Sequence, residues 1–146
     1  MLIKDIMTRV VRSVEATATL QEAAEIMVRY DIGALPVLGA DACSLVGMVT
    51  DRDLATRAVA KGLDPSSTRV AAVMSSNVIV VYEDQDVEEA AWMMEIRHIR
   101  RLIVVDGRRR ATGVVSLGDL SVRGSGAELG GEVLKYVSEE GGVALD

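Results

Sequence analysis

The pattern of hydrophobic and polar positions along this chain occurs twice. Residues 5–37 align with residues 72–104 without a gap, and the segment Gly47 to Leu54 returns as Gly113 to Leu120 after a hairpin that is one residue shorter. A repeat of this length implies two copies of one supersecondary unit that bury their apolar faces together. We therefore expect two related halves with pseudo-two-fold symmetry and equivalent clefts between them, where function should lie.

Each copy is predicted to begin with a short helical lead that ends in Met, followed by an extended β-branched segment. These segments are 3–7 and 10–14 in the first copy, and 70–74 and 78–82 in the second. A hairpin of two strands comes later, and Asp106-Gly107 is a strong turn signal in the second copy. The predicted strands are 34–38, 45–49, 102–105 and 112–115.

The first helix of each copy carries the same predicted apolar stripe. Thr19-Leu-Gln-Glu22 is a capping-box signal for a helix start, and Asp86-Val-Glu-Glu89 is a looser version of it. Apolar residues then recur at i, i+3, i+4 and i+7. They are Leu20, Ala23, Ala24 and Met27 in the first copy, and Val87, Ala90, Ala91 and Met94 in the second.

A second helix follows each hairpin, which completes a β-α-β-β-α order. We expect it at 54–61, with Gly62 as its C-terminal stop, and in shorter form after Leu120. This order predicts an α+β fold (mixed α/β) in which helices pack on small sheets. The predicted domains are a first repeat at 1–61, a linker at 62–69, a second repeat at 70–123 and a Gly-rich tail at 124–146.

The tail contains one further helical pattern. Residues 128–139 could form a short amphipathic helix with Val133, Leu134 and Val137 on its apolar side. Two alternatives stay open: a helix that binds a partner or seals a dimer, and a terminal helix that packs loosely.

Composition narrows the function classes. The chain has 146 residues with 49% hydrophobic and 26% charged positions, which indicates a globular protein. A net charge of −6 and an aromatic content of 3% argue against nucleic-acid binding. No apolar run reaches the ~18–20 residues of a membrane helix, and the N-terminus lacks the pattern of a secretory signal. Because the single cysteine, Cys43, cannot form an internal disulfide, we expect a reducing, cytoplasmic location.

Thr50-x-x-Asp53 and Ser116-x-x-Asp119 recur between the last strand and the last helix of each copy. One interpretation is structural, since a hydroxyl and a carboxylate at this spacing cap a helix and stabilise it by ~1 kcal/mol. The other is functional, because the same groups suit a phosphorylated sugar, and the carboxylate can accept from both hydroxyls of a ribose diol. The two interpretations are compatible.

The duplicated unit resembles a CBS-domain pair (a Bateman module). The resemblance rests on Asp31-Ile-Gly-Ala-Leu-Pro-Val37 before the hairpin and on Gly-x-Val-Thr-x-x-Asp-Leu after it, and it covers residues 3 to about 122. With nothing else attached, the chain is similar to stand-alone pairs of the bacterial hypoxic-response type. The resemblance implies an adenosine ligand such as AMP, ATP or S-adenosylmethionine in clefts between the repeats, a disc-shaped homodimer, and a regulatory rather than enzymatic role with no required cofactor.

Carried over by position, the resemblance assigns Asp53 and Asp119 to ribose, and Thr50 and Ser116 to ribose or phosphate. The segments that would line adenine are Ala34-Leu35-Pro36 and Arg101-Leu102-Ile103. The opposite wall would contain Thr8, Arg9, Ser75 and Ser76.

The two copies differ in ways that bear on a ligand. The first has the small Gly33, Ala34 and Pro36 where a base must approach the backbone, whereas the second has Arg100, Arg101 and Ile103. Arg100 and Arg101 could pair with a phosphate, or Arg101 could fill its cleft, or both could be solvated. Arg52 lies inside the first motif, close to any phosphate bound there, whereas the matching Gly118 of the second offers no charge. We therefore favour the cleft of Thr50 and Asp53.

Two rival functions stay open. One is a structural or protein-interaction module whose clefts bind nothing, with an unidentified protein partner. The other is an enzyme or redox sensor centred on Cys43 or on His98, the single histidine. No Cys or His spacing typical of a zinc site is present.

Overall fold

The computed structural model describes residues 1–9 and 12–122, which form two compact units. Residues 12–78 belong to one unit, and residues 1–9 together with 79–122 belong to the other. The units therefore do not coincide with the sequence repeats, because the opening segment of each repeat lies in the unit built mainly by the other. Val10, Val11 and the predicted tail at 124–146 lie outside the described residues.

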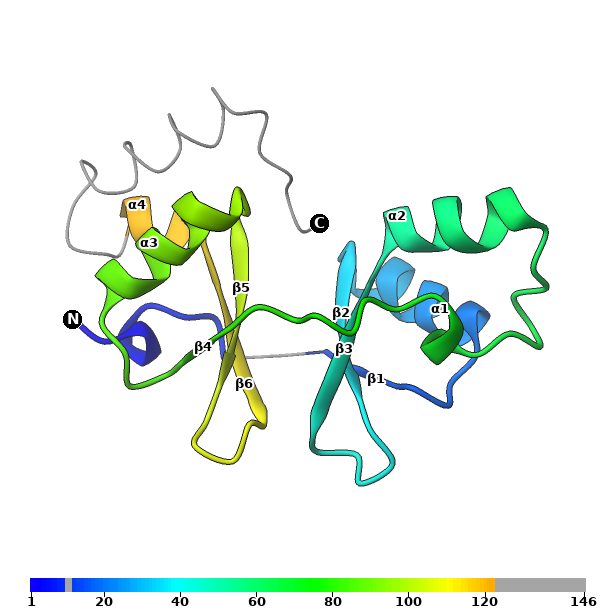
Figure 1. Ribbon diagram of the computed structural model, residues 1–146, viewed down its shortest axis with the longest axis horizontal. Coiled ribbons are helices and arrows are strands. Elements are labelled where there is room, and N and C mark those ends of the chain that lie inside the picture. Colours follow the sequence, from blue (N-terminus) through cyan, green and yellow to red (C-terminus); the bar gives the residue numbers. More distant parts are fainter. Residues whose placement is uncertain (10–11, 123–146) are drawn as a thin grey trace. The chain divides into compact units, whose positions relative to one another are not determined.

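The unit of residues 12–78 has the predicted order of elements (Figure 1). Its elements are β1 (Val14–Glu15), α1 (Leu20–Tyr30), β2 (Ala34–Leu38), β3 (Leu45–Thr50) and α2 (Asp51–Asp53). The helix that starts with α2 continues as a π-helical turn at Leu54–Ala58 and a 3-10 turn at Val59–Lys61, and a separate 3-10 turn spans Val70–Ala72. In the sheet, β1 is parallel to β2 and β2 is antiparallel to β3.

The second unit has the same topology. Its elements are a 3-10 turn at Ile3–Asp5, β4 (Val80–Tyr82), α3 (Val87–Arg97), β5 (Arg101–Val105), β6 (Ala111–Ser116) and α4 (Leu117–Val122). Here β4 is parallel to β5, and β5 is antiparallel to β6. The predicted mixed α and β fold and its repeated order are confirmed. No helix among the described residues is long and apolar enough to span a lipid bilayer.

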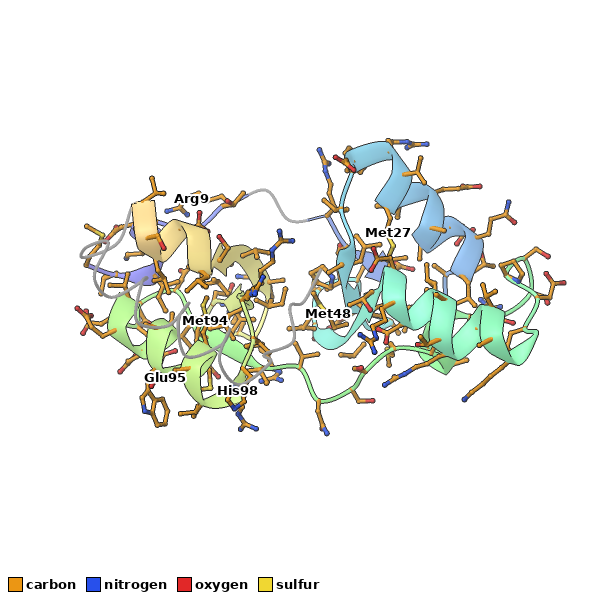
Figure 2. The ribbon with its side chains drawn as sticks, turned by 90° about the horizontal axis from the view of Figure 1, so that it is seen from above. Arg9, Met27, Met48, Met94, Glu95 and His98 are labelled. Atoms are coloured by element: carbon orange, nitrogen blue, oxygen red, sulfur yellow. The ribbon has the colours of Figure 1, made fainter. Side chains whose placement is uncertain are left out.

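Each unit has its own hydrophobic core, and the predicted helical stripes face it. The equivalent residues Met27 of α1 and Met94 of α3 are 7% and 0% exposed (Figure 2). Around them pack the other buried residues of the stripes, namely Leu20 and Ala23 in α1 and Val87, Ala90 and Ala91 in α3. Ala24 is only partly buried. Each large side chain buried in this way stabilises its unit by ~1.5–3 kcal/mol.

The predicted capping box is confirmed for α1, whereas α3 starts at the predicted place, after Asp86, without a side-chain cap. The backbone N–H of Glu22 donates to Thr19 Oγ1 at 3.2 Å, and that of Thr19 donates to Glu22 Oε2 at 3.1 Å. The side chain of Asp86 makes no such bond. Instead, Val87 N donates to the carbonyl of Met1 and Glu89 N to that of Asp86. Backbone carbonyls therefore satisfy these donors without a side-chain cap.

The segment predicted as a linker packs against the start of α1. Leu20 N donates to the carbonyl of Thr68 at 2.9 Å, and Gln21 N donates to that of Pro65 at 3.1 Å. The preceding helix ends where it was predicted to end, at Gly62, whose φ of 70° lies in the left-handed region that glycine adopts without strain. Residues 64–69 are thus an integral part of the unit.

Candidate functional site

The first half-site, which we define as Thr50, Asp53 and the backbone around them, is built at the junction of β3 and α2. Thr50 N donates to Asp53 Oδ2 at 2.9 Å, and Asp53 N donates to Thr50 Oγ1 at 3.0 Å. The predicted capping box is therefore present. The side chain of Asp53 is only 14% exposed, so the box holds a carboxylate in a fixed and partly sheltered position.

Strand pairing places the predicted adenine segment beside this box. Ala34 of β2 lies opposite Thr50, and Pro36 lies opposite Met48. The carbonyl of Gly33 accepts from Asp51 N at 2.9 Å, which fixes the end of β2 to the start of α2. Leu35 is fully buried in the core, so only its backbone is available at this edge.

Ser75, which belongs to the second sequence repeat, lies alongside the first half-site. Met48 N donates to the carbonyl of Ser75 at 2.9 Å, and Ser75 N donates to that of Met48 at 2.8 Å. A Cβ atom on Gly47 would lie 2.9 Å from the Ser75 carbonyl oxygen, so the close approach requires glycine. Residues of both repeats thus meet within one compact unit.

Arg57 belongs to the same cluster and was missed by the sequence analysis. Its Nε lies 3.6 Å from Asp53 Oδ1, and its Nη1 donates to the carbonyl of Val73 at 3.2 Å and to Ser75 Oγ at 3.4 Å. The available signal was the i, i+4 spacing from Asp53. The same spacing recurs as Asp119 and Arg123, the latter outside the described residues.

Two other predicted residues of this half-site are not brought into contact with it. Arg52 is exposed, and the hydrogen bonds at this position involve its backbone: its N–H donates to Asp51 Oδ1 at 2.8 Å, and its carbonyl accepts from Thr56 Oγ1 at 2.8 Å. Ser76 is exposed as well, and its carbonyl accepts from Val78 N.

The second half-site, defined as Ser116, Asp119 and the backbone around them, repeats this construction. Ser116 N donates to Asp119 Oδ2 at 2.8 Å, and Asp119 N donates to Ser116 Oγ at 3.1 Å. Arg101 lies opposite Ser116 in the sheet, and the carbonyl of Arg100 accepts from Leu117 N at 2.8 Å.

The N-terminal segment supplies the second half-site's equivalent of Ser75. Thr8 and Val114 exchange backbone hydrogen bonds of 2.9 and 3.0 Å. Arg9 follows, but its Nη2 donates to the carbonyl of Lys4 at 3.3 Å, so its guanidinium is directed to its own segment (Figure 2). Leu102 is fully buried, whereas Arg100 and Arg101 are exposed.

The carboxyl groups with a shifted pKa and the single cysteine lie outside the two half-sites. The carboxyls whose pKa is lowered are those of Asp41, Asp64 and Asp106, and in each the main cause is a hydrogen bond from within its own turn. Cys43 is exposed in a loop. A surface hollow of about 390 Å³ lies along β1 and α1, and its lining includes none of the predicted site residues.

The described residues do not form a metal site of clustered side chains. Within the described parts of the chain, no three or more His, Cys, Asp or Glu side chains are grouped so that they could hold a metal ion. His98 directly follows α3 as its C-cap residue, and its backbone N–H donates to the carbonyl of Glu95 at 3.4 Å (Figure 2). Both half-sites offer carboxylate and hydroxyl acceptors and backbone groups, and the first also offers the guanidinium of Arg57. These groups can bind a polar ligand.

Comparison with known proteins agrees with this construction. The model of the CBS domain family matches residues 3–60 and 70–123. CBS domain-containing protein YhcV of Bacillus subtilis is 38% identical over 138 residues, which are 94% of this chain and 96% of that protein. Hypoxic response protein 1 of Mycobacterium tuberculosis is 35% identical over 118 residues, which are 81% of each chain.

Solved structures share the fold and differ in what they hold. CBS domain protein PAE2072 from Pyrobaculum aerophilum, complexed with AMP, has a TM-score of 0.74 at 26% identity and covers 95% of this chain and 99% of its own. The CBS domain pair of MJ0100, with 5-methylthioadenosine and S-adenosyl-L-methionine, has a TM-score of 0.71 at 30% identity, with 90% and 98% covered. Hypoxic response protein I with two coordinated zinc ions has a TM-score of 0.74 at 34% identity, with 83% and 97% covered.

Proposed function

Because this chain belongs to the CBS domain family, we propose that it is a non-enzymatic regulatory protein that binds an adenosine compound at its half-sites. The observation that carries the proposal is the repeated hydroxyl–carboxylate pair. Thr50 with Asp53, and Ser116 with Asp119, each lie between a strand and a helix, with backbone from the other repeat alongside. Similar structures hold AMP, methylthioadenosine or S-adenosylmethionine.

In this proposal Asp53 and Asp119 accept hydrogen bonds from the ribose hydroxyls. An ionised carboxylate offers about four acceptor positions, and in Asp53 one oxygen accepts from Thr50 N while the other faces Arg57. Acceptor capacity therefore remains after the cap has formed. Thr50 and Ser116 would contact ribose or phosphate, and the backbone near Ala34 and Leu102 would contact adenine.

The first half-site is proposed as the stronger one. The small residues Gly33 and Ala34 lie just before and at the start of its strand β2, whereas Arg100 and Arg101 occupy the equivalent positions at the start of β5 in the second. Because an adenine ring must approach the backbone closely to be recognised there, the absence of large side chains favours the first.

Binding of the adenosine compound would change the geometry of a homodimer of this chain in the cytoplasm, or would be sensed by a partner protein. A ligand can shift a conformational equilibrium only by its difference in affinity for the two states. The signal is therefore limited by how much more tightly one arrangement binds the adenosine compound.

Calorimetric titration with AMP, ATP and S-adenosylmethionine tests the proposal. We expect saturable binding by the wild type and its loss in Asp53→Ala, with a smaller loss in Asp119→Ala. Glu22→Ala is the matched control, since it removes the acidic member of the equivalent capping box at α1, which includes no predicted site residue. Absence of binding by the wild type, or equal effects of Asp53→Ala and Glu22→Ala, would contradict it.

A ligand-free interaction module is the second candidate. It is favoured by the fact that both Ser/Thr–Asp pairs form the same reciprocal capping bonds as Thr19 and Glu22. This candidate predicts that the Asp53 and Asp119 variants lose only capping energy, about 0.5–2 kcal/mol each.

A further inference from the structure

The contacts of Arg57 indicate which adenosine compounds the first half-site prefers. Resting on the proposed function, we propose that Arg57 makes this half-site select adenosine compounds that carry a phosphate over those with a neutral or sulfonium group at the same end. The proposal concerns the ligand class and deepens the assignment of the site.

The guanidinium of Arg57 is held close to Asp53. The side chain of Arg57 is 47% exposed, so it can meet a ligand, while its Nε lies 3.6 Å from Asp53 Oδ1. Its Nη1 donates to the carbonyl of Val73 and to Ser75 Oγ. These contacts fix the guanidinium beside the carboxylate that would hold the ribose, within reach of a group attached to that ribose.

The guanidinium of Arg57 also has N–H donors left for a ligand. A guanidinium has five N–H donors in a planar fork that matches phosphate oxygens. The contacts of Arg57 use Nε and Nη1, and its Nη2 has no partner within residues 1–9 and 12–122. A phosphate could therefore be bound without breaking the contacts that hold Arg57 in place.

A ligand at this half-site meets the positive charge of Arg57. Asp53 is compensated twice, by the N–H of Thr50 on one oxygen and by Arg57 on the other, and it is 14% exposed. Arg57 is the more exposed member of the pair, and the N–H donors of its Nη2 are the ones left for a ligand. A phosphate gains from this arrangement, whereas a sulfonium is repelled by it and a neutral thioether gains nothing.

The test is calorimetric titration of the full chain with AMP, adenosine, methylthioadenosine and S-adenosylmethionine. We expect the wild type to bind AMP at least about tenfold more tightly than the other three, as one charge-assisted hydrogen bond provides. In Arg57→Gln the affinity for AMP should fall to about that for adenosine, whereas the affinity for adenosine should change much less. Arg57→Lys keeps the charge and should keep part of the preference. Arg29→Gln, the same charge change at an exposed position of α1, should alter none of the four affinities.

Different failures have different meanings. Equal binding of AMP and adenosine by the wild type would overturn the selection by charge and leave the proposed function in place. An equal loss of affinity for all four compounds in Arg57→Gln, with circular dichroism showing a folded protein, would also overturn it. Arg57 would then serve to position Val73 and Ser75 and would not bind the phosphate. No binding of any compound by the wild type would overturn the proposed function and this inference with it.

Discussion

Met48 and Ser75 exchange both of their backbone hydrogen bonds, at 2.9 and 2.8 Å, although one lies in the first sequence repeat and the other in the second. Thr8 and Val114 are related in the same way in the other unit. Each half-site therefore has one flank donated by the opposite repeat. The stability of this pairing can be tested separately from ligand binding.

Gly113→Ala should weaken that pairing. A Cβ atom at this position would lie 2.8 Å from the carbonyl oxygen of Thr8, and backbone cannot move aside as a flexible side chain can. We expect the free energy of unfolding to fall by about 1–3 kcal/mol in urea denaturation. Gly107→Ala, where no atom lies within 4 Å of the added Cβ, is the control in the same unit and should change little. Equal effects of the two substitutions would contradict the close approach.

Thr50→Ala should destabilise the protein by about 1 kcal/mol, because Asp53 N loses its acceptor at the start of the helix. Thr50→Ser keeps the hydroxyl and should restore most of this loss. Chemical denaturation measures both. If Thr50→Ser is as unstable as Thr50→Ala, then the methyl group rather than the cap matters.

Acid titration should reveal the turn around Asp41. Hydrogen bonds from the Ser44 hydroxyl and then from the N–H groups of Ser44 and Cys43 lower the pKa of Asp41 from 3.8 to about 2. Since the folded pKa lies below the ordinary value, the stabilisation by this carboxylate is complete above pH 3.8 and is lost as the pH falls towards 2.

Ser44→Ala should therefore raise the pKa of Asp41 towards 3.8, as followed by NMR of the carboxyl carbon. The carboxyl of Asp106 is the internal control. Its pKa is also lowered, first by the N–H of Arg110, and it should not respond to Ser44→Ala. An unchanged pKa of Asp41 would contradict the assignment.

Two neighbours on α3 should differ in their effect on stability. Met94 is fully buried and Trp92 is 58% exposed. We expect Met94→Ala to lower the free energy of unfolding by about 2–5 kcal/mol and Trp92→Ala to change it by less than about 0.5 kcal/mol. Light scattering of Trp92→Ala should be recorded alongside, because a change of mass would place this residue in a homodimer interface instead.

Much of the fold could be predicted from the sequence because its signals are local. The stripe from Leu20 to Met27 has helical period, Asp106-Gly107 specifies a tight turn, and Gly62 stops a helix. Each depends on residues that are close in sequence, so periodicity and turn chemistry are sufficient. The hydroxyl–carboxylate pairs of the candidate site were predicted for the same reason.

The contacts that were missed connect distant segments. Both copies carry the same opening segment and the same strand glycine, at Gly47 and Gly113. The local sequence therefore does not decide whether an opening segment pairs with the strand of its own repeat or with that of the other. The hydrogen bond from Arg57 to Ser75 depends on which of these pairings forms. The hydrogen bond from Val87 N at the start of α3 to the Met1 carbonyl depends on it as well. Sequence patterns do not contain this information.

The division into units sets the order in which the nascent chain can complete them. The unit of residues 12–78 has all of its strands and helices once Val78 has been synthesised, although it does not begin at the N-terminus. Residues 1–9 are made before the unit of residues 12–78, whereas their partners in 79–122 are made after it. On the ribosome, where domains form as units while synthesis proceeds, Ile3 and Ile6 therefore lack their core partners until the second sheet has been translated.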